Sequence, residues 1–92
     1  MSDMKQGTHK FFMGDESAPS AIIEFRPESD NVIDIYHTAV SDALGGQGIG
    51  TKLVEQVVDY ANENQLKITA SCSFARRVID QFPEFKQFLA GK

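Results

Sequence analysis

The chain has 92 residues, of which 41% are apolar and 24% are charged, and its formal net charge is −4. A chain of this length forms one domain with one modest core, and its acidic balance argues against general nucleic-acid binding. No apolar run reaches the length of a membrane span, and the first residues lack the apolar stretch of a secretory signal. The single cysteine, Cys72, cannot form an internal disulfide. We therefore expect a cytoplasmic protein that binds neither membrane nor nucleic acid.

The first part of the chain predicts a polar, flexible segment followed by an antiparallel sheet. Residues 1–8 are polar, and we expect the single folded domain to span residues 9–92. Alternating apolar residues predict three strands, at residues 10–13, 20–26 and 32–40. A stretch dense in turn residues, 27–31, separates the last two strands and makes them antiparallel neighbours. In the third strand, strict alternation places on one face Ile33, Ile35, His37 and Ala39.

The second part of the chain predicts a helix, a parallel strand and two short helices. Apolar residues at spacings of three and four predict an amphipathic helix over residues 48–62. Residues 66–72 alternate as a fourth strand, and the order strand, helix, strand makes it parallel to the third. Helices at 74–81 and 84–89 follow, with Pro83 between them. The fold class is therefore α+β: three antiparallel strands, a helical crossover to a parallel fourth strand, and C-terminal helices.

A glycine-rich segment leads directly into the first predicted helix. Its sequence is Gly45-Gly46-Gln47-Gly48-Ile49-Gly50-Thr51. A glycine turn at a helix start leaves backbone N–H groups without partners near the positive end of the helix dipole, which suits phosphate or pyrophosphate. A Walker loop does not fit, because Thr51 precedes Lys52 and that motif needs the reverse order. A dinucleotide-binding fold does not fit either, because it needs a small residue in place of Thr51 and a longer chain.

The segment resembles the pyrophosphate-binding loop of the GCN5-related N-acetyltransferases. Gly48 and Gly50 match that family's glycine positions, whereas Gly45 stands where the family usually has Arg or Gln. The resemblance extends over residues 10–88 and includes the later motifs Cys72-Ser73-Phe74 and Phe82-Pro83-Glu84-Phe85. The order of these motifs is similar to that in a branch of the family with short chains, about the size of this one. The resemblance implies the mixed sheet of that family.

The resemblance also implies acetyl-CoA as the cosubstrate. The pantetheine arm would pair with the end of the third strand, and the pyrophosphate would lie on the amides of residues 45–51. Residues at the start of the next helix are further candidates, although a solvated helix face also accounts for its two arginines. The candidate cofactor-binding residues are Thr38, Ala39, Val40, Gly45, Gly46, Gln47, Gly48, Ile49, Gly50, Thr51, Ser73, Phe74, Arg76 and Arg77.

Two side chains are candidates for the chemistry. The resemblance implies a cysteine near the thioester, and Cys72 would either carry the acetyl group or donate a proton to the departing thiolate. Filling a small volume of the core is the ordinary alternative for a lone cysteine. His37 is a natural base for the incoming amine because imidazole titrates near neutral pH, although a histidine on an apolar face is commonly structural. The His, Cys and Asp residues lack metal-ligand spacing, so we expect no metal.

Taken together, these features predict an N-acetyltransferase that moves an acetyl group from acetyl-CoA to a primary amine. The amine would belong to a small molecule, or to a lysine or the N-terminus of a protein. Neither the acceptor nor the oligomeric state follows from the sequence. A non-catalytic acyl-CoA-binding or sensor module is the alternative, and a plain structural or interaction domain is a third hypothesis.

Overall fold

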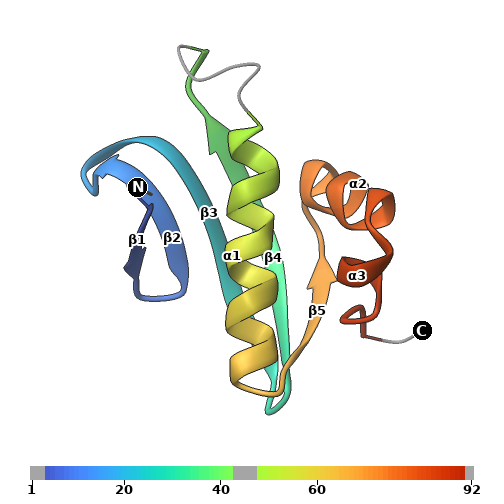
Figure 1. Ribbon diagram of the computed structural model, residues 1–92. Helices are drawn as coiled ribbons and strands as arrows, with labels where there is room; N and C mark the ends of the chain where they lie inside the picture. Colours follow the sequence, from blue (N-terminus) through green and yellow to red (C-terminus); the bar gives the residue numbers. More distant parts are fainter. Residues whose placement is uncertain (1–3, 43–47, 91–92) are drawn as a thin grey trace.

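The computed structural model describes residues 4–42 and 48–90, which form a five-stranded sheet with helices packed on one face (Figure 1). The strands are β1 Met4–Gly7, β2 Lys10–Asp15, β3 Ala18–Ser29, β4 Val32–Val40 and β5 Lys67–Ala70. They lie in sequence order across the sheet. Neighbours from β1 to β4 are antiparallel, whereas β4 and β5 are parallel. The predicted fold class is therefore confirmed.

Three helices cover the sheet in the described part of the chain. The helix α1, Ile49–Glu63, is the crossover that a parallel β4–β5 pair requires. The helices α2, Ser73–Gln81, and α3, Pro83–Lys86, follow β5 and lie beside α1 and β5 (Figure 1). Pro83 occupies the first turn of α3, where its missing N–H removes no helical hydrogen bond. Within residues 4–42 and 48–90, no helix is both long and apolar enough to cross a membrane.

The core lies between the sheet and the helices and joins all of these elements. Ile23 and Phe25 of β3, Ile35 of β4, Leu53 of α1 and Ile79 of α2 are each at most 2% exposed. Burying one such side chain contributes about 1.5–3 kcal/mol to folding. This shared core fixes the start of α1 and the start of α2 relative to the end of β4.

The sheet begins earlier in the chain than the sequence indicates. Met4–Gly7, in the segment that we expected to be flexible, pairs with β2 in a register that places Met4 opposite Met13. The side chains of Lys5 and Gln6 are exposed, and the strand is held by backbone pairing at the sheet edge. Such pairing leaves no apolar alternation in the sequence, which is why β1 is missed. The predicted turn at 27–31 is also shorter, because β3 continues to Ser29.

A β-bulge interrupts β4 at Tyr36. Phe25 of β3 is opposite Ile35, and the preceding Glu24 is opposite His37. Tyr36 therefore has no opposite residue on β3, and one extra residue has entered β4. A single inserted residue exchanges the two faces of the strand beyond it.

The bulge corrects the face that we predicted for the end of β4. Thr38 lies opposite Ile23, which is fully buried, so Thr38 faces the helices and the core. His37 and Ala39 are exposed and face the other side of the sheet. Strict alternation had placed them with Ile33 and Ile35, because a bulge leaves no mark in the apolar pattern.

Candidate functional site

The N-terminus of α1 is a helix end without a side-chain cap. Gly48 is the N-cap residue, and its φ of 71° lies in the left-handed region that glycine adopts without strain. The Lys52 N–H donates to the Gly48 carbonyl oxygen at 3.1 Å and begins the helical ladder. The N–H groups of Ile49, Gly50 and Thr51 therefore have no acceptor within the helix. This end can hold an anion. Three predicted contacts lie outside the described residues: Gly45, Gly46 and Gln47.

Gly50 and Phe74 bring the first turns of α1 and α2 into contact. A Cβ atom on Gly50 would stand 2.6 Å from the ring carbon Cε2 of Phe74, and closer still to Cζ. Only glycine allows the ring to lie this close to the α1 backbone. The ring remains 37% exposed. Two predicted cofactor contacts from distant parts of the chain therefore lie side by side.

Cys72 is the N-cap residue of α2, and its thiol donates a hydrogen bond to the Thr38 hydroxyl oxygen. Sγ lies 3.5 Å from the Thr38 hydroxyl oxygen, and the backbone N–H groups of Phe74 and Ala75 also interact with it. Burial raises the pKa of the Cys72 thiol, but these hydrogen bonds outweigh burial and leave that pKa below its ordinary value. The arrangement therefore increases the fraction of thiolate at a given pH, and the thiolate is the nucleophilic form.

The edge of β4 that faces β5 opens at Cys72. Pairing between β4 and β5 ends with Ile35 opposite Ala70, and the Cys72 N–H then donates to the Ile35 carbonyl oxygen at 3.1 Å. From there the chain turns into α2 while β4 continues. In the part of the chain that the structure describes, residues 38–40 have strand partners on β3 alone. Their free edge can pair with an extended ligand.

The two predicted catalytic side chains, His37 and Cys72, lie on opposite sides of the sheet. His37 is exposed and lies opposite Glu24, on the face away from the helices. Thr38, on the helix-covered face, is the side chain that contacts Cys72. The sequence placed Thr38 among the backbone contacts of a cofactor but gave no signal that its hydroxyl meets the Cys72 sulfur.

Asp34 is a positioning residue that the sequence analysis missed. It is 2% exposed and accepts hydrogen bonds from the Thr69 hydroxyl at 2.8 Å, the Ser71 N–H at 3.0 Å and the Ser71 hydroxyl at 2.8 Å, while Arg26 lies 3.3 Å away. Burial raises the pKa of Asp34, but these hydrogen bonds and the Arg26 charge hold it below the ordinary value. The carboxylate thus fastens the residue before Cys72. A charge between two isoleucines of a strand is the signal that could have found it.

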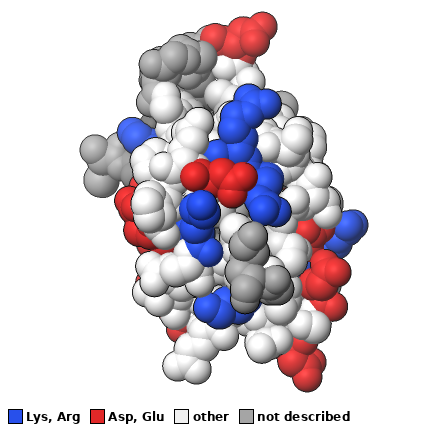
Figure 2. Space-filling view, turned by 90° about the vertical axis from the view of Figure 1, so that its right-hand side faces the viewer, with Lys and Arg blue, Asp and Glu red and all other residues white. Residues whose placement is uncertain are grey.

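Cations gather on the outer side of α2 and α3. Arg76 lies 3.3 Å from Asp80, whereas Arg77 is exposed and has no ion pair among the described residues. Lys86 of α3 is also exposed. Figure 2 shows Lys and Arg side chains around a carboxylate on this face of an otherwise acidic protein. Ser73, the first residue of α2, is exposed as well. Ser73 and Arg77 are accessible to an anion near the start of α2.

The chain is similar in sequence and in fold to known proteins. The family model described as GCN5-related N-acetyl-transferase matches residues 10–88. A GCN5-like protein from Staphylococcus aureus, solved by NMR, is 46% identical, with a TM-score of 0.83 and coverage of 100% of this chain and 93% of that one. The NATD1 proteins of Gallus gallus and Homo sapiens are 27% identical over 63 residues, which is 68% of this chain but 57% and 56% of those proteins. A GNAT-family acetyltransferase from Elizabethkingia anophelis, solved with acetyl-CoA bound, shares the fold at 18% identity and a TM-score of 0.60, over 78% of this chain and 50% of that one.

Proposed function

Because the chain belongs to the GCN5-related N-acetyltransferase family, we propose that it binds acetyl-CoA and transfers the acetyl group to a primary amine. The observation that carries this proposal is the position of Cys72. Its sulfur has a depressed pKa and lies at the N-cap of α2, where the pairing of β4 with β5 ends. The acceptor is a small amine, or a lysine or N-terminus of a protein. A reducing cytoplasm suits the free thiol.

The residues near Cys72 fit the parts of acetyl-CoA. The N–H groups at the start of α1 suit the pyrophosphate, and the free β4 edge at residues 38–40 suits the amide groups of pantetheine. Arg77, which has no ion pair within residues 4–42 and 48–90, offers a cation to the phosphates, whereas Arg76 already has a carboxylate partner. The Elizabethkingia anophelis enzyme, which has the same fold, was solved with acetyl-CoA bound. We propose that the domain expected at residues 9–92 also includes β1, Met4–Gly7, and that this domain binds the coenzyme.

In the first step the Cys72 thiolate attacks the carbonyl carbon of the thioester. The bond from that carbon to the coenzyme sulfur breaks, the coenzyme leaves as a thiolate that takes a proton from water, and the acetyl group stays on Sγ. The Thr38 hydroxyl and the N–H groups of Phe74 and Ala75 stabilise the attacking thiolate beforehand. They also keep the sulfur at the edge where the acetyl group would arrive.

In the second step the amine nitrogen attacks the acetyl carbon on Cys72. The carbon–sulfur bond breaks, an amide forms, and Cys72 returns to the thiolate. The amine loses its proton to solvent water, because His37, the expected base, lies on the face of β4 away from Cys72. In the alternative role, Cys72 protonates the departing coenzyme during direct transfer to the amine.

Mass spectrometry of the intact protein tests the proposal. After incubation with acetyl-CoA and no amine, we expect one added acetyl group on the wild type and none on Cys72→Ala. Release of free coenzyme only with an amine, and no adduct, would leave Cys72 either the proton-donor role or a purely structural one. Binding of acetyl-CoA with neither an adduct nor release under any amine would contradict the proposed reaction and favour a sensor module.

A further inference from the structure

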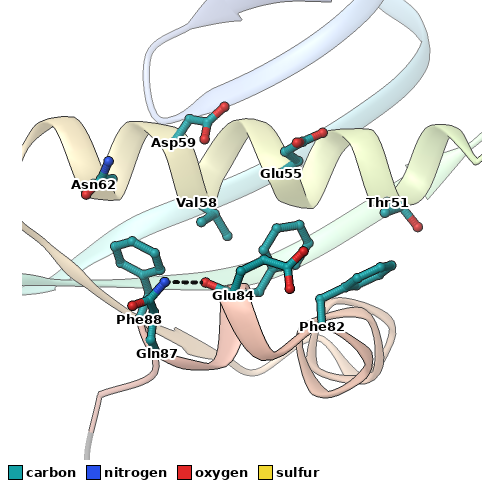
Figure 3. Close-up of a pocket in the computed structure, with 10 residues that line it drawn as sticks. Thr51, Glu55, Val58, Asp59, Asn62, Phe82, Glu84, Gln87 and Phe88 are labelled. Carbon is teal, nitrogen blue, oxygen red and sulfur yellow. Dashed lines mark hydrogen bonds between the residues drawn. The ribbon is translucent and has the colours of Figure 1, made fainter.

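A groove of about 510 Å³ separates α1 from α3 (Figure 3). It extends along α1 from Thr51 to Asn62, with Phe82 opposite the Thr51 end and Phe88 toward the Asn62 end. The two predicted catalytic residues, Cys72 and His37, do not line the groove. The groove therefore adjoins the proposed coenzyme site at Thr51 but contains neither of the two predicted catalytic side chains.

Aromatic rings form the wall of the groove on the α3 side. Phe82 and Phe85 pack with their ring centroids 5.1 Å apart, and Phe88 continues the wall. Val58 of α1 points toward these rings (Figure 3). The Lys67 ammonium lies 6.0 Å from the centroid of the Phe88 ring, so this ring already has a cation beside it. The wall therefore suits apolar groups.

Carboxylates stand at the rim of the groove. Glu55 and Asp59 come from α1 and Glu84 comes from α3, and all three are exposed. Of the groove-lining residues in the described part of the chain, none is Lys or Arg. An acidic rim disfavours the phosphates of a coenzyme and attracts a cation. The chemistry of the rim therefore calls for a positively charged occupant.

The length of the groove distinguishes a polypeptide from a small amine. From Thr51 to Asn62 the helix rises by about 16 Å, which matches roughly five residues of extended chain. Glu55 and Asp59 are one helical turn apart, about 6 Å along the axis. Alternate side chains of an extended segment are separated by about 6.7 Å. Two cationic side chains at alternate positions can therefore reach the two carboxylates together.

We propose that this groove binds an extended basic segment of a partner polypeptide. Lys or Arg side chains at alternate positions meet Glu55 and Asp59, and the apolar residues between them contact the phenylalanine wall. Glu84 faces the segment from the other side. This site needs no acetyl transfer, so its failure and the failure of the proposed reaction are separate outcomes.

Fluorescence anisotropy at fixed, moderate salt tests the proposal with a labelled short peptide that alternates lysine and leucine. We expect saturable binding to the full chain, and at least about tenfold weaker binding to Asp59→Lys, a loss that corresponds to about 1.4 kcal/mol. Glu63→Lys is the matched control. Glu63 is also exposed on α1 but does not line the groove, and its replacement by lysine changes the charge by the same amount. This variant should bind within about twofold of the wild type. Acetyl-CoA should raise the apparent stability of both variants equally.

Three results would overturn the proposal. Equal losses of peptide affinity in Asp59→Lys and Glu63→Lys would show that the peptide is attracted by the net charge of the protein alone. Equal binding of a peptide that alternates glutamine and leucine would show that the carboxylates are not used. Displacement of the peptide by acetyl-CoA would assign the groove to the coenzyme.

Discussion

At the scale of single residues, the contact between Gly50 and Phe74 predicts that the effect of Gly50→Ala on stability depends on whether the Phe74 ring is present. Alanine in place of a glycine stabilises a helix by up to about 1 kcal/mol in its interior, which is an upper bound for Gly50 in the first turn of α1. In the wild type the new Cβ would stand 2.6 Å from a Phe74 ring carbon, so the ring must leave its place and this gain should vanish or reverse. In a Phe74→Ala background, Gly50→Ala should recover the full gain. Denaturant unfolding of the four proteins measures this coupling, and equal stabilisation in both backgrounds would contradict the packing.

The same scale shows how much of the candidate site the sequence could predict. Cys72 and Gly50 are recognisable from residue type and from the motifs around them. The hydroxyl that meets the Cys72 sulfur could not be predicted, because Thr38 reaches it only through the bulge at Tyr36. The expected neighbour, His37, turns to the other face for the same reason. A one-residue shift in strand register is a tertiary feature that apolar alternation does not record.

At the scale of elements, Asp34 joins β3, β4 and the end of β5. Asp34→Asn keeps the shape but replaces a carboxylate oxygen with an amide donor that faces the Ser71 donors. We expect the free energy of unfolding at neutral pH to fall by about 2 kcal/mol or more, since a buried hydrogen-bonding group loses its partner. Asp59→Asn, on the exposed side of α1, should change it by less than about 0.5 kcal/mol.

The pH dependence gives that prediction a second measurement. The pKa of folded Asp34 lies below the ordinary carboxyl value of 3.8. Its contribution to stability is therefore complete above that value and is lost as the pH falls through the lower, folded value. Stability of the wild type should decline in that acid range more steeply than stability of Asp34→Asn, as followed by denaturant unfolding at stepped pH. Parallel declines would show that the carboxylate is not ionised in the folded protein.

The elements themselves differ in how well the sequence predicts them. The helix α1 is predicted within one residue at each end, because its buried positions repeat at spacings of three and four. The strand β4 is predicted with its observed ends, Val32 and Val40, although not with its bulge. The strand β1 is missed, because it has one apolar side chain packed against the core, Met4, and a single apolar residue forms no alternating pattern.

At the scale of the whole molecule, the fold class follows from two local rules. Turn-separated strands pair antiparallel, and a helix between two strands makes them parallel neighbours. Those rules predict the order of the sheet from β2 to β5. They do not predict that the starts of α1 and α2 meet, because that contact depends on the shared core and on the glycine at position 50. The distribution of charge, cations over α2 and α3 and carboxylates at the groove, also appears only in three dimensions.

The most direct measurement is an NMR titration of the labelled protein with acetyl-CoA. If the start of α1 holds the pyrophosphate and Cys72 meets the thioester, the amide signals of Ile49, Gly50 and Thr51 should shift together with those of Thr38 and Cys72. The signals of Val58 and Phe88, in the groove beside α3, should stay in place. Absence of any shift at residues 49–51, or shifts confined to the groove, would contradict acetyl-CoA binding at this site.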